Sequence, residues 1–334
     1  MPVITTPQEF NEEDLFVDLR ELYGYPLYLK CEGFNFAGSV KLKAAASMVA
    51  AAELSGQLRP GSTIIESSSG NLGMALGLIA ANKGYRFVCV VDSRTNPSTR
   101  QVIEALGSEV HVITEPSPTS GFLGARLDYV RALCEGDSSY VWLNQHANPD
   151  NWRAHYRTTA PTIEKQFPAI EYLFVGAGTT GTLMGCARYF KDQPGSDVTV
   201  VGIDSQGSVT FGAEPGPRSI PGLGAGVRPA LFDESYLDDY VLVSEEDTIR
   251  TCHALARGGF LFGGSTGTVV RGALEWLERH RPGEDVTAVA ISPDLGDRYL
   301  DTVYRTEWVR EVYGLDERDL GLPPDIVSSG VGEP

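Results

Sequence analysis

The chain has 334 residues, of which 42% are apolar and 21% are charged, as in an ordinary folded enzyme. Its 44 acidic and 27 basic residues give a net charge of −17, which disfavours nucleic acid and anionic membrane surfaces as partners. The five cysteines are odd in number and far apart in sequence, a pattern that predicts neither a disulfide framework nor a metal site.

The N-terminal stretch MPVITTPQEFNEED is acidic and has no long apolar core, so we expect no signal peptide. No apolar run is long enough to span a bilayer. These features favour a cytoplasmic protein.

Short apolar runs alternate with amphipathic runs along most of the chain, and the alternation restarts after Pro161. Such alternation with short connections predicts an α/β fold, with two lobes that each contain a mostly parallel sheet flanked by helices. Ser244 is placed to cap a helix that follows it. The predicted strands lie in 62–67, 87–93, 109–115, 172–178, 198–205, 239–243 and 286–294; the predicted helices lie in 71–84, 97–107, 121–136, 179–193, 245–258 and 264–283.

Two lysines, Lys41 and Lys43, stand at the start of an alanine-rich helical run, FNFAGSVKLKAAASMVAAAE. A lysine near a helix start is usually a solvated surface side chain. Here its neighbours are small and apolar, and desolvation lowers the pKa of a lysine amine, as a nucleophile requires.

The segment ESSSGNLG (66–73) joins a predicted strand to a predicted helix. Its hydroxyls, glycine and amide at a helix N-terminus suit a bound carboxylate. Ser69 or Asn71 as a simple helix cap is the alternative. A cap needs one such residue, and the run of four small or polar residues favours binding.

The segment GAGTTGT (176–182) also lies between a strand and a helix, and its glycines, threonines and helix N-terminus suit a phosphate. Gly176, Gly178 and Gly181 equally match the dinucleotide pattern G-x-G-x-x-G, with Asp204 as a ribose ligand. A plain tight turn is a third interpretation. A third loop of this kind is GGSTGT (263–268). The alternative to a binding role is that Ser265 or Thr266 simply caps the following helix.

Taken in order, these segments resemble the fold-type II pyridoxal-phosphate enzymes of the cysteine synthase and cystathionine β-synthase family. The resemblance covers about residues 20 to 310. The matching segments are NFAGSVK (35–41), SSGNLG (68–73), NQHANPDNWRAHY (144–156), GTTGT (178–182), IPGLGAG (220–226), GGSTGT (263–268) and SPDLGDRYLDTVY (292–304).

The resemblance implies pyridoxal 5'-phosphate as cofactor and chooses Lys41 over Lys43 for the imine, by its spacing from Ser39. Asn71 is implied to hydrogen-bond the ring hydroxyl. Ser265 is implied to face the ring nitrogen. A serine hydroxyl, unlike an aspartate, does not hold this nitrogen protonated, so the ring is a weaker electron sink and β-elimination is favoured over transamination. The phosphate is assigned to Gly178, Thr179, Thr180, Gly181 and Thr182, and the substrate carboxylate to Ser68, Ser69, Gly70 and Gln145.

Several departures from the cysteine synthase pattern resemble a branch that makes precursors of 2,3-diaminopropionate for siderophores and antibiotics, the N-(2-amino-2-carboxyethyl)-L-glutamate synthases. Leu72 replaces the usual threonine, and Arg126 lies where an arginine handles the acidic substrate. Arg218 is a weaker candidate for that cation. His146 and Gly178 stand where a relative has tyrosine and serine, so the preferred substrate that donates the β-carbon can differ.

The resemblance therefore implies a β-replacement that joins O-phospho-L-serine to L-glutamate. A cysteine synthase that uses sulfide, with O-acetylserine or O-phosphoserine as donor, is the nearest alternative, and a non-catalytic binding homologue is a remote one. The family also implies a homodimer whose partners are small amino-acid substrates. We expect a large cofactor-binding domain from 1–42 and 151–320, a small mobile domain from 43–150 and a disordered tail from 321–334.

Overall fold

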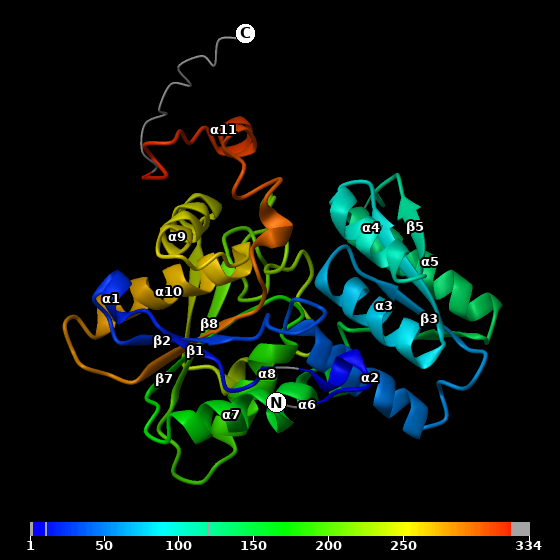
Figure 1. Cartoon of the computed structure of the whole chain (residues 1–334), viewed down its shortest axis with the longest axis horizontal. Helices are drawn as coiled ribbons and strands as arrows, with labels where there is room; N and C mark the ends of the chain where they lie inside the picture. The colour runs from blue at the N-terminus through cyan, green and yellow to red at the C-terminus, as the bar shows by residue number, and fades with distance from the viewer. Residues whose placement is uncertain (1–2, 11, 119, 322–334) are drawn as a thin grey trace.

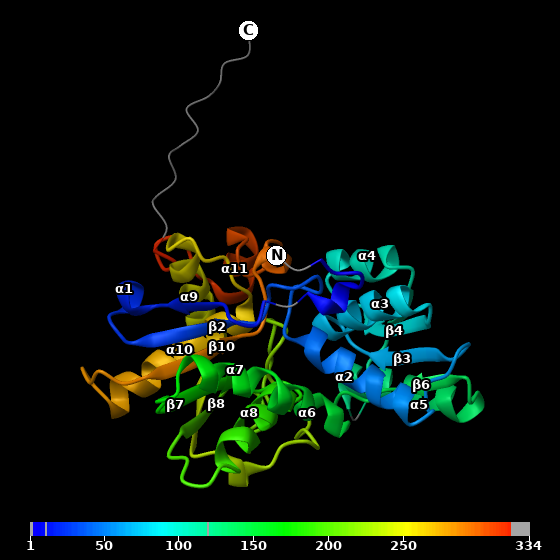
Figure 2. The same cartoon turned by 60° about the horizontal axis from the view of Figure 1, so that its bottom comes forward.

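The computed structural model describes residues 3–10, 12–118 and 120–321, so the predicted tail lies almost entirely outside the described residues. Two sheets lie side by side and each is flanked by helices (Figures 1 and 2). The predicted α/β fold is therefore confirmed. None of the helices in the described ranges is both long enough and apolar enough to cross a bilayer.

The larger sheet has the strand order β1-β2-β10-β7-β8-β9. Its neighbours pair in parallel, except for the short strand β1, which runs antiparallel to β2 at one edge. The strands are β1 (Phe16–Asp18), β2 (Leu27–Cys31), β7 (Tyr172–Gly176), β8 (Thr199–Ser205), β9 (Asp239–Val243) and β10 (Ala288–Ser292).

The smaller sheet is wholly parallel and has the order β5-β4-β3-β6. All four strands come from one continuous part of the chain, between the second and third strands of the larger sheet in sequence. They are β3 (Thr63–Ser67), β4 (Arg86–Asp92), β5 (Glu109–Ile113) and β6 (Tyr140–Trp142).

Helices cover both faces of the larger sheet, because successive residues of a strand point to opposite faces. In β7, Phe174 packs into the core under α10, whereas Leu173 and Val175 pack into the core under α7 and α8. The α-helices are α1 (Arg20–Tyr23), α2 (Lys41–Leu54), α3 (Asn71–Lys83), α4 (Pro97–Ala105), α5 (Gly121–Gly136), α6 (Pro149–Arg157), α7 (Thr159–Gln166), α8 (Gly181–Lys191), α9 (Glu245–Arg257), α10 (Gly264–His280) and α11 (Thr306–Tyr313), and the short 3-10 helices are η1 (Pro7–Glu9), η2 (Glu234–Tyr236) and η3 (Asp297–Tyr299).

Two helix ends follow the local signals in the sequence. Helix α3 ends at Lys83 because Gly84 takes a left-handed conformation with φ +73°, which favours glycine. Helix α9 begins after Ser244, whose hydroxyl accepts a hydrogen bond from the backbone N–H of Asp247, so the predicted cap is confirmed.

Helix α2 connects the two sheets. It packs against α3 beside the smaller sheet and against α6 beside the larger one (Figure 2). Its buried residues Leu42, Ala45 and Met48 belong to the core of the smaller sheet. The first residue of this helix, Lys41, therefore lies at the junction between the sheets.

Candidate active site

Lys41 is placed by the loop that precedes α2. Within this loop the Asn35 side-chain amide donates to the carbonyl of Ser39 over 3.0 Å, which closes a turn. The loop also pairs with the chain after β10, since the N–H of Val40 donates to the Pro293 carbonyl over 2.7 Å and Ser39 forms a bridge with Asp294. These contacts bring Lys41 next to a carboxylate that lies far away in sequence.

Burial lowers the pKa of Lys41 to about 8, and the nearby Asp294 carboxylate partly opposes that shift. By surface area the residue is only partly buried. A lysine with this pKa has a substantial neutral fraction near neutral pH and can act as nucleophile or base. Lys43 is different, because it forms an ion pair of 2.9 Å with the buried Glu32.

The loop after β3 turns tightly into α3. The hydroxyl of Ser68 accepts the N–H of Gly73 over 2.9 Å, so Ser68, rather than Ser69 or Asn71, acts as the local cap. Ser69, Gly70 and Asn71 are each partly exposed at the start of the helix. The N-terminus of α3, with its free N–H groups, is thus open to an anion.

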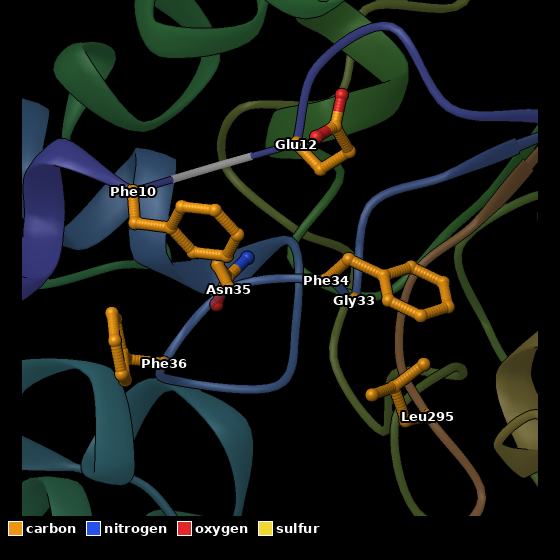
Figure 3. Close-up of a pocket in the computed structure, with 7 residues that line it drawn as sticks. All are labelled: Phe10, Glu12, Gly33, Phe34, Asn35, Phe36 and Leu295. Atoms are coloured by element: carbon orange, nitrogen blue, oxygen red, sulfur yellow. The ribbon is translucent and has the colours of Figure 1, made fainter. Parts of the chain in front are cut away.

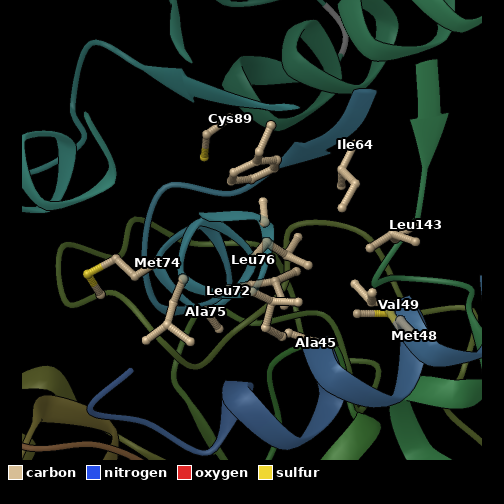
Figure 4. Packing of buried hydrophobic residues seen from close by; sticks show 14 of the residues in the cluster. Ala45, Met48, Val49, Ile64, Leu72, Met74, Ala75, Leu76, Cys89 and Leu143 are labelled. Carbon is tan, nitrogen blue, oxygen red and sulfur yellow. The ribbon is translucent and has the colours of Figure 1, made fainter. Parts of the chain in front are cut away.

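Leu72 lies in the hydrophobic core and not on the surface of the loop. Its side chain is 1% exposed and packs with Met48 and Leu76 (Figure 4). The side chain of Leu72 is therefore part of the core, and the contact of this residue with a substrate stays a prediction.

Gln145 lies beside this loop because Glu66 joins the ends of β3 and β6. The Glu66 carboxylate accepts the N–H of Gln145 over 3.2 Å and the indole N–H of Trp142 over 3.1 Å. The Gln145 side-chain amide in turn donates to the Ser67 carbonyl over 3.1 Å. Sequence reasoning gave Glu66 no role, although it begins the segment ESSSGNLG.

The glycine-threonine loop lies between β7 and α8. Thr180 has a left-handed φ of +67°, which turns the chain into the helix. A Cβ at Gly181 would collide with the Asn151 carboxamide, whose nitrogen donates to the Thr179 hydroxyl over 3.1 Å. The hydroxyl of Thr182 lies 3.3 Å from a ring nitrogen of His155.

The loop also meets the segment 220–226. A Cβ at Gly178 would lie 2.8 Å from the carbonyl oxygen of Gly222. The N–H of Gly224 donates to the Ala177 carbonyl over 3.0 Å. These close contacts between the two segments leave a compact backbone cradle at the start of α8, a helix of 11 residues. Such a cradle suits a phosphate.

Ser265 is the second residue of α10 and is 3% exposed. Its hydroxyl lies against Gly222, where a Cβ would be 2.1 Å from it and 3.6 Å from the Tyr299 hydroxyl. The Tyr299 hydroxyl donates to Asp294 over 2.6 Å. Ser265 and Tyr299 thus both lie next to Gly222, and Tyr299 binds the carboxylate beside Lys41.

Arg126 and His146 lie on the side of the smaller sheet. Arg126 is 9% exposed, and its Nε lies 3.5 Å from the Asp92 carboxylate, while its Nη1 has no hydrogen-bond partner among the described residues. Burial, with the charges of Lys41 and Arg126, lowers the pKa of His146 to about 4. His146 is thus neutral at neutral pH and adds no cation to the site. Arg218 donates to the Gly207 carbonyl, and a Cβ at Gly224 would lie 2.5 Å from its Nε.

A surface pocket of about 390 Å³ lies on the outer side of the loop before α2 (Figure 3). Phe10, Phe34 and Phe36 give it an apolar lining. Its lining includes none of the predicted site residues, so it is distinct from the junction at Lys41.

Comparisons with known proteins agree with this geometry. The model of the family "Pyridoxal-phosphate dependent enzyme" matches residues 16–294. The chain belongs to this family. A relative from Ralstonia nicotianae, named N-(2-amino-2-carboxyethyl)-L-glutamate synthase, is 37% identical over 86% of this chain and 84% of its own length. A relative of the same name from Cupriavidus metallidurans is 36% identical over 89% of this chain and 88% of its own length.

Among solved structures, the O-acetylserine dependent cystathionine beta-synthase from Helicobacter pylori matches with a TM-score of 0.84 and 30% identity, over 91% of this chain and all of that chain. The predicted family, the fold-type II architecture and pyridoxal phosphate as cofactor are thereby confirmed, as is the expectation of an enzyme. The dinucleotide interpretation of the glycine loop is set aside.

The residues at the junction fit pyridoxal phosphate. The cradle at α8 suits its phosphate, and the amine of Lys41, with its lowered pKa, suits its aldehyde. Within the described ranges, Asp294 Oδ1, Ser39 Oγ and Ser67 Oγ are buried polar atoms without a hydrogen-bond partner. Such atoms are costly unless a ligand or water satisfies them, which indicates a site built for a polar group.

Proposed function

We propose that this enzyme joins O-phospho-L-serine to L-glutamate and releases N-(2-amino-2-carboxyethyl)-L-glutamate and phosphate, for 2,3-diaminopropionate biosynthesis. The bond between the β-carbon and the phosphate oxygen breaks, and a bond from that carbon to the glutamate nitrogen forms. The observation that carries the proposal is the name shared by two relatives at 36–37% identity over most of both chains.

Lys41 is the proton-transfer residue in this proposal. Pyridoxal phosphate, when bound, withdraws electrons from the α-carbon of the attached amino acid. The Nζ of Lys41, with its pKa lowered by burial to about 8, takes the α-proton and later returns it. The position of Lys41 at the junction of the sheets lets one amine serve both steps.

The remaining residues bind and orient. The N-terminus of α3, with Ser68, Ser69 and Gly70, and the nearby Gln145 hold the substrate carboxylate. Asn71 would face the ring hydroxyl of the cofactor and Ser265 its ring nitrogen. The backbone of 178–182 would hold its phosphate. Since a parallel sheet presents its loops at the carboxyl ends of its strands, these groups converge on one junction.

Arg126 supports an acidic substrate. The leaving phosphate and L-glutamate are both anions, and the whole chain carries a net charge of −17, so the site needs a local cation. Arg126 is buried, and its Nη1 has no hydrogen-bond partner among the described residues. We assign Arg126 to the side-chain carboxylate of L-glutamate, with the neutral His146 beside it.

A matrix of donors and nucleophiles tests the proposal. O-phospho-L-serine, O-acetyl-L-serine and L-serine are each combined with L-glutamate, sulfide and ammonia, and products are read by mass spectrometry. We expect the fastest turnover with O-phospho-L-serine and L-glutamate. Arg126→Met should raise the KM for L-glutamate about tenfold or more and leave turnover with sulfide unchanged, because it removes one charge-assisted contact.

A sulfide-using cysteine synthase is the second candidate. It is favoured by the structural likeness to an O-acetylserine dependent enzyme. Faster turnover with sulfide than with L-glutamate would establish this alternative and overturn our choice.

The domain boundaries at residues 42 and 150, the homodimer and the cytoplasmic location also stand as proposals. Limited proteolysis and the mass of the protein in solution test the first two.

A further inference from the structure

The side-chain amide of Asn71 is held between two opposite charges from the larger lobe. Its Nδ2 donates to the Asp294 carboxylate over 2.8 Å. Its Oδ1 accepts a hydrogen bond from the Arg298 guanidinium. Neither residue is near Asn71 in sequence, and neither belongs to the loops from which the site was first predicted.

This pair of contacts leaves the amide one orientation. A guanidinium can only donate, so it must meet the amide oxygen, and the carboxylate accepts from the amide NH2 group. Asp294 also receives the Tyr299 hydroxyl over 2.6 Å. Burial raises the pKa of Asp294, and the hydrogen bonds from Tyr299 and Asn71, with the charge of Arg298, partly oppose that shift. The second hydrogen of the Asn71 NH2 group is then left for a ligand.

Arg298 also reaches the loop that carries the reactive lysine. Its guanidinium donates to the carbonyl of Ala37, and a Cβ at Gly38 would lie 2.5 Å from it. Gly38 has a φ of +63°, so a larger residue would be strained there as well as crowded. The loop is thus shaped to admit Arg298, which ties the start of α2 to the start of α3.

Asp294 connects the two ends of the same site. It is fully buried, and its Oδ2 accepts from both Asn71 and Tyr299. Tyr299 in turn lies near Ser265 at Gly222, where a Cβ would be 2.1 Å from the Ser265 hydroxyl and 3.6 Å from the Tyr299 hydroxyl. One carboxylate therefore holds the amide assigned to the ring hydroxyl and a tyrosine near the serine assigned to the ring nitrogen.

We propose that Arg298 and Asp294 are positioning residues that hold the Asn71 amide with its NH2 group toward the ring hydroxyl of pyridoxal phosphate. This inference rests on the role assigned to Asn71 under the proposed function. It adds that the role of Asn71 depends on two residues of the other lobe, Arg298 and Asp294.

A double-mutant cycle on cofactor binding tests the inference. The dissociation constant of pyridoxal phosphate from the apoprotein is measured for wild type, Arg298→Met, Asn71→Ala and the double variant. We expect each single variant to weaken binding about tenfold, and the double variant to be no weaker than Asn71→Ala alone, because Arg298 acts through that amide. The absorbance spectrum of bound cofactor should change in the same way in both single variants.

The outcomes distinguish the role of Asn71 from the role of Arg298 and Asp294. If Asn71→Ala binds the cofactor normally, the assignment of Asn71 to the ring hydroxyl is wrong. If Asn71→Ala weakens binding but Arg298→Met does not, or if their effects add, the positioning role is wrong and the assignment survives. Asp294→Asn should resemble Arg298→Met in affinity and spectrum, and normal values for both would overturn the inference.

Controls address folding. The exposed Arg305 and Asp297 lie in the same segment, so Arg305→Met and Asp297→Asn should leave cofactor affinity unchanged. The thermal midpoint of each apoprotein shows whether a variant has lost its fold. Arg298→Lys, which retains the charge but cannot donate to Asn71 and Ala37 as a planar fork, should recover only part of the affinity.

Discussion

Glu66 accepts the backbone N–H of Gln145 over 3.2 Å, so one carboxylate joins the two segments assigned to the substrate carboxylate. The Glu66 side chain is fully buried, and burial raises its pKa from 4.5 to about 7. The indole of Trp142 and the N–H of Ser67 also donate to it and partly oppose that shift. The charge of Glu66 therefore changes within the range of pH in which the enzyme is assayed.

Stability should fall as pH rises through this range. Between pH 4.5 and about 7 the folded chain retains the Glu66 proton that the unfolded chain has lost, so the free energy of unfolding decreases with rising pH. Glu66→Gln removes this titration, and its curve against pH should be flatter than that of wild type. Denaturant titrations at several pH values provide the measurement. Exposed Glu104→Gln is the control, and parallel curves for wild type and Glu66→Gln would contradict the prediction.

Capture of the cofactor by the apoprotein should depend on the Lys41 amine. Only the neutral amine attacks an aldehyde, and burial lowers the pKa of Lys41 from 10.5 to about 8. The rate of capture, followed by absorbance, should rise with pH to a midpoint near 8. Lys83→Met removes an ion-paired lysine of α3 and should keep that midpoint, whereas Lys41→Ala should abolish covalent capture. A midpoint close to 10.5 would show that the amine is solvated.

Gly181→Ala should damage the phosphate loop. Its Cβ would meet the buried Asn151 carboxamide, which also donates to the Gln145 carbonyl over 2.7 Å. We expect a loss of about 1–3 kcal/mol in unfolding free energy, typical of overpacking, and weaker cofactor binding. Gly136→Ala is the matched control, because no atom lies within 4 Å of a Cβ at this helical glycine. Equal behaviour of the two variants in thermal unfolding would refute the close approach.

Leu72→Thr should affect stability and not specificity. The side chain is 1% exposed within an apolar cluster, so a hydroxyl there would be buried among apolar groups (Figure 4). Burying an unpaired hydroxyl costs about 1–3 kcal/mol. The ratio of turnover with L-glutamate to turnover with sulfide should stay the same. A changed ratio at unchanged stability would show that Leu72 contacts the substrate after all.

Local patterns were sufficient to predict most of the parallel strands and the loops that follow them. The strand β2 was missed because it contains Lys30, which looks like a surface residue. Lys30 is fully buried and forms an ion pair of 2.9 Å with Glu32. A buried pair of opposite charges has the same sequence signature as two solvated ones, so the pattern of apolar residues was interrupted.

The site shows the same limit. Lys41 and the three loops carry local signals and could be named as candidates from the sequence, and their roles stay predictions. Arg298 and Asp294 lie in a segment that matched the family, yet no role followed from the match. Their contacts with Asn71 depend on how the two sheets meet, and one sequence without its fold does not contain that information.

The path of the chain between the sheets has a consequence for synthesis on the ribosome. Strand β2 pairs in parallel with β10, so Leu27 pairs with Ala288, a residue almost the whole chain away. Pairing over such a separation forms slowly, whereas the smaller sheet comes from one continuous stretch and can fold as soon as it emerges. Asp294 follows β10 directly. We therefore expect Lys41 to receive its carboxylate neighbour late in folding, and a chain that ends before Asp294 lacks that carboxylate.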